Sequence, residues 1–148
     1  MCCLAYRLGF TGSYLILDLP EFSALQRFYL KRLGLPLSQK AGAGIRLVSS
    51  VDGVVAELEA SAGRSLFLAS WSISEVPVDQ REPVLALVEP FEAFLIGYAN
   101  RFCEIDNQVY FQRWREGPGL ASKRWSNNAL AHLPGQHCLI GLDRSAKR

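Results

Sequence analysis

Three apolar runs separated by turn residues lie in the middle of the chain, between Ile45 and Ile73. Asp52-Gly53 separates the first run from the second, and Gly63 lies between the second and the third. An Asp-Gly pair between apolar runs is typical of a tight hairpin turn, because this turn needs the positive φ that glycine adopts freely. We therefore predict three consecutive strands that pair as an antiparallel meander.

The third predicted strand carries apolar side chains on both of its faces. Leu66 and Leu68 alternate with Phe67, Ala69 and Trp71. Successive side chains of a strand point to opposite faces, so both faces of this strand need cover.

A helix is predicted before the meander. Its apolar residues recur at spacings of three and four and form one stripe: Phe22, Leu25, Phe28, Tyr29 and Leu33. Asp18 and Pro20 suit its start, and Gly34 and Pro36 end it.

A second helix is predicted over residues 80–97, with a bend near Val88 because Pro90 removes a backbone hydrogen bond. Asp106-Asn107 then predicts a second hairpin, over residues 101–113. Beyond it, residues 120–133 have a weak helical pattern and residues 137–142 form a short strand. The predicted fold is α+β, a twisted antiparallel sheet of about five strands with two to three helices, in a single domain over residues 1–148. Residues 114–148 form a loosely packed basic C-terminal extension in this prediction.

The composition is that of a globular chain, with 49% hydrophobic and 20% charged residues. The formal net charge is +2, but the charges are segregated along the chain. Residues 1–50 carry six cations against two acids, residues 51–112 carry three against ten, and residues 113–148 carry seven against two. An acidic middle between basic ends favours self-association or a charged partner; a solvated surface without a partner explains it equally well.

The four cysteines are Cys2, Cys3, Cys103 and Cys138, and their spacing matches neither a disulfide framework nor a zinc motif. Reduced thiols and a cytoplasmic location are therefore expected. The N-terminus lacks the basic segment of a secretory signal, and no apolar run is long enough for a membrane span.

No catalytic motif is present, so we predict no catalytic residue, no metal and no cofactor. His132, His137 and Cys138 could ligate a metal, but ordinary surface histidines and a buried thiol explain them better. Cys103 sits in an apolar context that suggests packing. Glu57 and Glu59 share one face of their predicted strand, which is more often a solvated face than an acid–base pair.

A second reading is nucleic-acid binding by the basic, tryptophan-containing region. It interleaves cations with indole rings: Arg113, Trp114, Arg115, Lys123, Arg124 and Trp125. Such residues stack on bases and contact phosphates in proteins that bind single strands. Packing of both tryptophans in the core is the simpler explanation.

The order of predicted elements resembles the class I type III secretion chaperones of Gram-negative pathogens, over about residues 21–113. The resemblance rests on the first helix with its Leu33-Gly34-Leu35-Pro36 ending, the meander with its acidic second strand, the helix over residues 83–97 and the hairpin over residues 101–113. It implies a cytoplasmic, non-enzymatic homodimer that holds an extended segment of a secreted effector in bacterial virulence.

Two sets of apolar residues follow from this picture. Those expected to bind the partner are Leu25, Phe28, Tyr29, Leu66 and Leu68. Those expected at the dimer contact are Phe91, Phe94, Val109 and Phe111. Packing in the core is the alternative for each of them.

Overall fold

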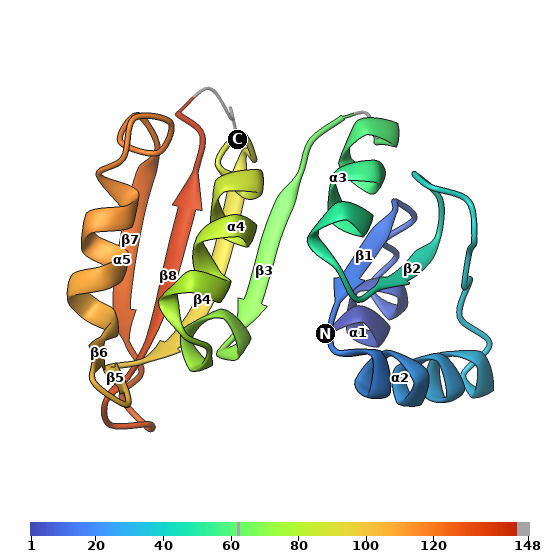
Figure 1. The fold of residues 1–148 in the computed structure, drawn as a ribbon, viewed down its shortest axis with the longest axis horizontal. Helices are drawn as coiled ribbons and strands as arrows, with labels where there is room; N and C mark the ends of the chain where they lie inside the picture. The colour runs from blue at the N-terminus through green and yellow to red at the C-terminus, as the bar shows by residue number, and fades with distance from the viewer. Residues whose placement is uncertain (62, 145–148) are drawn as a thin grey trace. The chain divides into compact units, whose positions relative to one another are not determined.

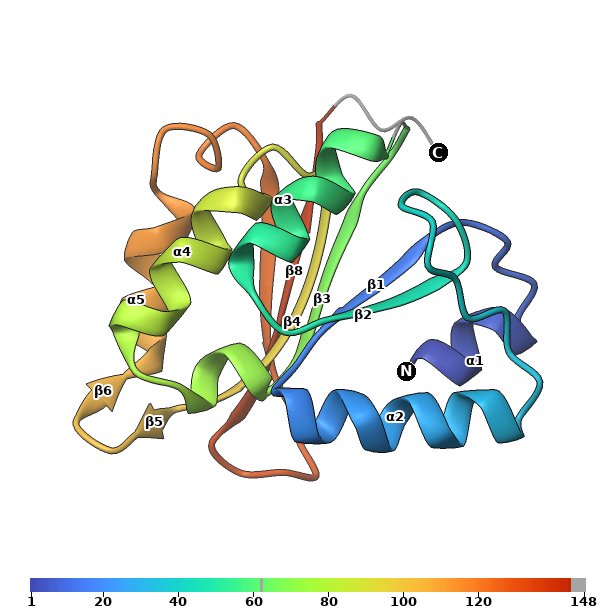
Figure 2. The same cartoon turned by 45° about the vertical axis from the view of Figure 1, so that its right-hand side comes forward.

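The computed structural model describes residues 1–61 and 63–144; the last four residues of the basic C-terminal segment lie outside this range. The chain divides into two compact units, Met1–Gly63 and Arg64–Arg148, which we describe separately (Figures 1 and 2).

The N-terminal unit is built on a pair of parallel strands joined by a helix. Its elements are α1 (Cys2–Arg7), β1 (Tyr14–Leu17), α2 (Pro20–Arg32), β2 (Ile45–Val48) and α3 (Val51–Ala60). Tyr14 pairs with Ile45 and Leu17 with Val48, so both strands run in the same direction. The helix α2 makes the crossover that a parallel pair requires. Cys2, Leu30 and Ile45 form the buried core of this unit.

The C-terminal unit is built on a mixed sheet. Its elements are β3 (Leu66–Ser70), the short 3₁₀ helix η1 (Ser72–Glu75), α4 (Val78–Val88), β4 (Ala93–Ala99), β5 (Arg101–Phe102), β6 (Ile105–Asp106), α5 (Asn107–Arg115), β7 (Arg124–Ala129) and β8 (Gln136–Leu142). The strand order is β3-β4-β8-β7, with β3 parallel to β4 and the other pairs antiparallel.

The core of the C-terminal unit lies between this sheet and the helices α4 and α5. Phe94, Ile96 and Tyr98 alternate along β4 and are almost fully buried. Leu85 of α4 and Phe111 of α5 pack against them. Both helices therefore cover the same face of the sheet (Figure 1).

The α+β class is confirmed, and the predicted first helix and the strand over residues 137–142 are present as α2 and β8. The predicted meander is wrong, because its middle strand is the helix α3. The Ser50 side chain accepts a hydrogen bond from the Gly53 amide at 3.2 Å, which caps the helix. Asp52-Gly53 therefore forms a first helical turn and not a hairpin.

The second hairpin and the second helix are also shorter than predicted. Only β5 and β6 form a hairpin, and α5 begins directly after them because the Asp106 carboxylate caps it, accepting from the Val109 amide at 3.1 Å. The helix α4 ends at Val88, before Pro90, and the apolar run over residues 93–99 is the central strand β4. A continuous apolar run is typical of a strand buried on both faces, and periodicity alone does not separate it from a helix.

The predicted loosely packed C-terminal extension is not observed in the described residues. Residues 124–129 form β7 in place of the weak helix, and β8 lies between β4 and β7 in the sheet. Leu120 and Leu139 are buried in the core, so this segment completes the C-terminal unit.

Candidate functional site

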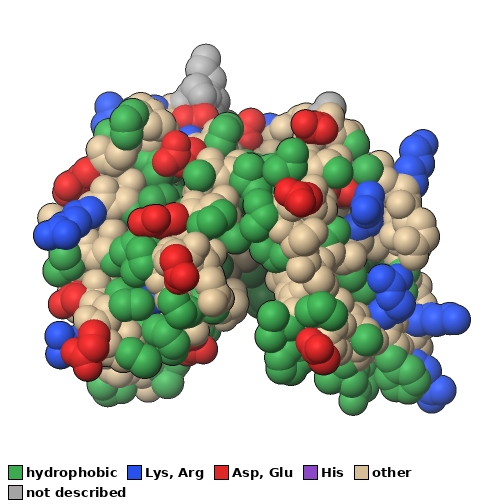
Figure 3. Space-filling model, viewed as in Figure 1, with side chains coloured by type: hydrophobic (Ala, Val, Ile, Leu, Met, Phe, Trp, Pro, Cys, Tyr) green, Lys and Arg blue, Asp and Glu red, His purple; other side chains and the backbone are tan. Residues whose placement is uncertain are grey.

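The helix α2 turns its apolar stripe away from the core. Leu25 is 51% exposed, and Phe28 and Tyr29 are each 58% exposed. Phe22 and Leu33, at the two ends of the stripe, are also more than half exposed. Figure 3 shows hydrophobic side chains gathered over α2. The stripe was identified correctly from its spacing, but it lies on the surface, which is unusual for five large apolar side chains in a row.

The opposite side of α2 faces the strands through both polar and apolar groups. Ser23 and Leu30 are buried there. The Ser23 hydroxyl lies 3.1 Å from that of Ser49, and the Gln26 amide donates to the Asp18 carboxylate at 2.6 Å. These hydrogen bonds fix the rotation of the helix and leave its apolar stripe without a partner in the described N-terminal unit.

The same contacts gather polar groups at the carboxyl ends of β1 and β2. Asp18 follows β1 and Ser49 follows β2, and the two strands are parallel, so both residues lie at one edge. One Asp18 oxygen accepts from the Leu19 amide at 2.8 Å. The carbonyl oxygen of the Gln26 side chain is buried and has no hydrogen-bond partner among the described residues. Buried acceptors in folded proteins normally accept a hydrogen bond, so this oxygen is unsatisfied.

The residues predicted to bind a partner divide into two groups. Leu25, Phe28 and Tyr29 lie together on the exposed face of α2. Leu66 is 56% exposed and Leu68 is half-buried, and both belong to β3 of the C-terminal unit. They alternate with Phe67, which packs against the core, so β3 carries apolar groups on both faces as the sequence indicated.

Two of the residues predicted at a dimer contact are core residues. Phe94 and Phe111 are each 1% exposed, so neither can contact a second subunit. Phe91 is half-buried against the same core. Val109, on α5, is 43% exposed and is therefore accessible to a second subunit.

The predicted nucleic-acid residues separate into buried and exposed members. The Trp114 and Trp125 rings pack against each other and against Phe94, with 5.6 Å between the two indole centroids. Lys123 is 6% exposed, and its ammonium lies over the Phe94 ring. These rings cannot stack on bases while they pack in the core. The cations Arg113 and Arg124 are exposed, and Arg115 is half-buried.

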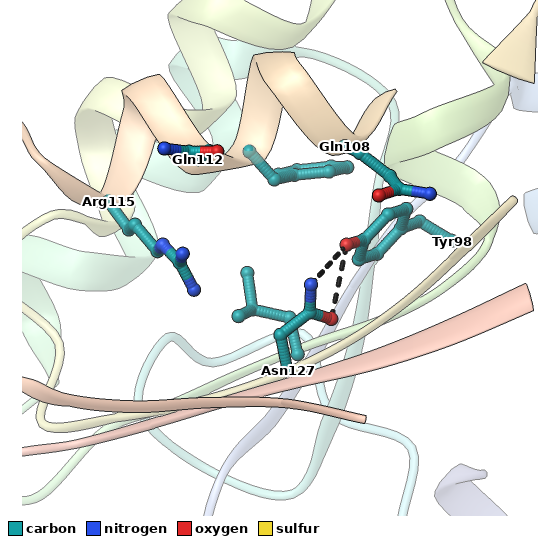
Figure 4. Close-up of a pocket in the computed structure, with 7 residues that line it drawn as sticks. Tyr98, Gln108, Gln112, Arg115 and Asn127 are labelled. Atoms are coloured by element: carbon teal, nitrogen blue, oxygen red, sulfur yellow. Dashed lines mark hydrogen bonds between the residues drawn. The ribbon is translucent and has the colours of Figure 1, made fainter. Parts of the chain in front are cut away.

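Arg115 lines a small polar cavity of about 50 Å³ between α5 and the sheet (Figure 4). Gln108 and Gln112 project from the same helix, and Tyr98 and Asn127 come from β4 and β7. The Asn127 amide donates to the Tyr98 hydroxyl at 2.8 Å. Burial raises the pKa of Tyr98 above its ordinary value. A cavity of this size holds a few water molecules. No spacing in the sequence marks these residues, because only the packing of α5 on the sheet brings them together.

A fully buried arginine organises the carboxyl ends of β3 and β4. The Arg81 guanidinium donates to the Val76 and Ser74 carbonyl oxygens at 2.7 Å each and to the Asn107 side-chain oxygen at 2.6 Å. Asn107 in turn donates to the Ala99 carbonyl oxygen at 2.9 Å. Burial lowers the pKa of Arg81 from its usual range. With no carboxylate in this network, the arginine serves as a hydrogen-bonding clamp between η1, β4 and α5.

The predicted acid–base pair is not formed, because Glu57 and Glu59 lie on α3 and not on a strand. Glu57 is 2% exposed, accepts from the Gly42 amide at 2.8 Å and pairs with Arg46 at 3.0 Å. Glu59 is exposed. Glu57 therefore ties the loop before β2 to α3.

The thiols and histidines lie in ordinary environments. Cys103 is exposed in the β5–β6 turn and not packed as expected. His137 stacks on Tyr98 with 5.2 Å between ring centroids, and Cys138 follows it on β8. Among the described residues, no three His, Cys, Asp or Glu side chains form a group that could hold a metal ion. No helix in the described ranges is both long and apolar enough to cross a membrane.

Comparison with known proteins gives a fold likeness only. No protein family and no curated protein matches the chain. Among solved structures, a chain of the Pnkp1/Rnl/Hen1 RNA repair complex is similar, with a TM-score of 0.60 and 9% sequence identity over 96% of the present chain. The present chain spans 35% of the length of that chain. At 9% identity, this similarity concerns the fold alone.

Proposed function

We propose that the protein is a non-enzymatic binding protein that docks another protein chain on the apolar face of α2. The observation that supports this is the exposure of Leu25, Phe28 and Tyr29, each more than half exposed on one helix face. Burial of one such side chain contributes about 1.5–3 kcal/mol, so three of them form the centre of an effective docking surface.

A dimer that holds an extended segment of a secreted effector, as the secretion-chaperone resemblance implies, is one form of this function. Of the four elements behind the resemblance, the first helix is present as α2. The helix α3 takes the place of the second strand of the meander, and β4 takes the place of the second half of the predicted second helix. The four free cysteines fit the reducing conditions of the cytoplasm, where we place the protein.

Affinity capture from the native cell, followed by identification of the bound proteins, tests the proposal. We expect the double variant Leu25→Gln/Phe28→Gln to lose a partner that the wild-type protein retains. Leu8→Gln is the matched control, because Leu8 is 78% exposed but lies outside α2. Capture of the same proteins by the α2 variant and by the control would contradict a role for this face.

A second candidate is a small ligand that carries hydroxyl groups, bound at the carboxyl ends of β1 and β2. It is favoured by the unpaired Gln26 oxygen next to the Asp18 carboxylate. In open sheets with parallel strands, ligands bind outside the carboxyl ends, where an acidic side chain accepts from the hydroxyls of a ribose. We expect adenosine to raise the thermal midpoint of the wild-type protein but not that of Asp18→Asn; equal shifts would exclude the site.

Nucleic-acid binding would use Arg113, Arg115 and Arg124 as phosphate contacts, whereas the Trp114 and Trp125 rings pack against the core. The fold likeness to a chain of an RNA repair complex makes single-stranded RNA the natural probe. Binding that weakens with salt and is lost when the three arginines are replaced by glutamine would favour this reading.

A further inference from the structure

A groove lies between α4 and α5 in the C-terminal unit. Its volume is about 750 Å³, and apolar side chains from both helices line it. They include Leu85 and Ala86 of α4, Val109, Tyr110 and Trp114 of α5, and Ile105 of β6. Figure 3 shows hydrophobic and acidic side chains side by side over these helices. Apolar grooves of this kind bind the apolar face of an amphipathic helix in many protein complexes.

The charges that line the groove are mainly negative. Glu82 of α4, Glu89 directly after α4 and Asp106 at the start of α5 contribute three carboxylates, and Arg113 is the one cation among the lining residues. The indole nitrogen of Trp114, also in the lining, is buried and has no hydrogen-bond partner among the described residues. An occupant should therefore be apolar on one face, positively charged and able to supply an acceptor.

The helix α2 is apolar on one face and positively charged. Its exposed stripe carries Phe22, Leu25, Phe28, Tyr29 and Leu33. The helix also carries three cations, Arg27, Lys31 and Arg32, against the single acid Glu21. Its 13 residues span about 20 Å, comparable with the helices that bound the groove.

We propose that α2 of one copy of the protein docks into the α4/α5 groove of a second copy. This inference rests on the proposed function and names the partner of the α2 face. The positive helix meets the negative groove, and the apolar stripe covers the apolar lining. Two such contacts related by a twofold axis close a dimer, whereas a single repeated contact gives a chain of subunits.

Charge reversal on each side tests the pairing, with sedimentation velocity as the measurement. The groove variant is Glu82→Lys/Glu89→Lys and the helix variant is Lys31→Glu/Arg32→Glu. We expect each alone to associate at least about tenfold more weakly than the wild-type protein, because like charges then face each other. An equimolar mixture of the two should recover association, since each copy then meets a complementary partner. Glu59→Lys, an exposed reversal on α3, is the matched control.

Three results would overturn the inference: a wild-type protein that stays monomeric, a groove variant that associates like the control, or a mixture that fails to recover. Circular dichroism of each variant first checks that it is folded. If Leu25→Gln/Phe28→Gln loses a captured protein while the groove variant keeps wild-type association, the groove is wrong and the proposed function stands. If Leu25→Gln/Phe28→Gln keeps both the captured protein and its self-association, both proposals fail.

Discussion

At the scale of single residues, buried polar side chains determine the local geometry of the C-terminal unit. Arg81 is completely buried, yet each of its three bonds goes to an oxygen of η1, the following loop or α5. The Arg81 guanidinium also lies over the Tyr110 ring, 5.0 Å from its centroid. In the sequence this arginine looks like one more cation of an amphipathic helix, and nothing in its neighbours reveals that it points inward.

Replacement of Arg81 by leucine should destabilise the protein by about 3 kcal/mol or more, because the Ser74, Val76 and Asn107 oxygens each lose the donor that Arg81 provides. Urea unfolding followed by tryptophan fluorescence measures this, since all three tryptophans belong to the C-terminal unit. Arg113→Leu, on the exposed side of α5, is the control. An unfolding free energy of Arg81→Leu within about 0.5 kcal/mol of the wild-type value would exclude the clamp.

Glu92 gives a pH-dependent prediction. Its carboxylate accepts from the Ser65 amide at 2.6 Å, which lowers the pKa of Glu92 below its usual value. A carboxyl group with a lowered folded pKa stabilises the protein above its unfolded pKa of about 4.3, and this contribution is lost as the pH falls through the folded value.

Glu92→Gln should therefore be less stable than the wild-type protein at neutral pH, by about 0.5–1 kcal/mol because the group is partly solvated. The difference should shrink towards about pH 3. Urea midpoints across this range measure it, with the exposed Glu104→Gln as control. A constant difference at all pH values would rule out the Ser65 bond as its source.

At the scale of elements, two Asp-containing dipeptides lie at helix starts. Asp52-Gly53 and Asp106-Asn107 both look like hairpin turns in the sequence, and both lie at the first turn of a helix, α3 and α5. The side chains of Ser and Asp bond nearby amides equally well in turns and at helix starts, so the local sequence favours both. Packing of the following residues decides between them, and Phe111 of α5 is buried in the core.

Removal of the α5 cap should be measurable. We expect Asp106→Ala to lower the free energy of unfolding by about 1 kcal/mol, because the Val109 amide loses its acceptor, and Asp106→Asn to retain most of it. Tryptophan fluorescence in urea reports the change, since Trp114 lies on α5. Gln112→Ala, at an exposed residue of the same helix away from the cap, should leave stability nearly unchanged; an equal loss there would mean that the effect is not specific to the cap.

At the scale of the whole molecule, the chain consists of two compact units, and its charges are segregated between helices. The helix α2 carries cations together with an exposed apolar stripe, and acids line the apolar groove of the C-terminal unit. On each of these two surfaces, apolar side chains are exposed and have no cover within the described part of their unit. Together they form a complementary pair, which is what the self-association proposal uses.

Salt should weaken this association. Between about 0.05 M and about 0.5 M NaCl the Debye length falls from about 14 Å to about 4 Å, which screens the pairing of α2 with the groove. We expect the dissociation constant to rise several-fold, as measured by sedimentation velocity at each salt concentration. A constant or falling value would indicate an apolar contact without charge pairing and would contradict the proposed geometry.

The sequence alone determined the α+β class, the extent of α2 and of β8, and the segregation of charge. These follow from spacing, turn residues and composition, which are local properties. Only the tertiary structure decided which side of α2 faces solvent, because hydrogen bonds from Ser23 and Gln26 to residues beyond the helix fix its rotation. It also decided that residues 93–99 are a strand, since their pairing with β3 and β8 is a long-range contact. An apolar stripe or run indicates only that its burial is favourable. Which surface buries it depends on the rest of the fold or on a partner.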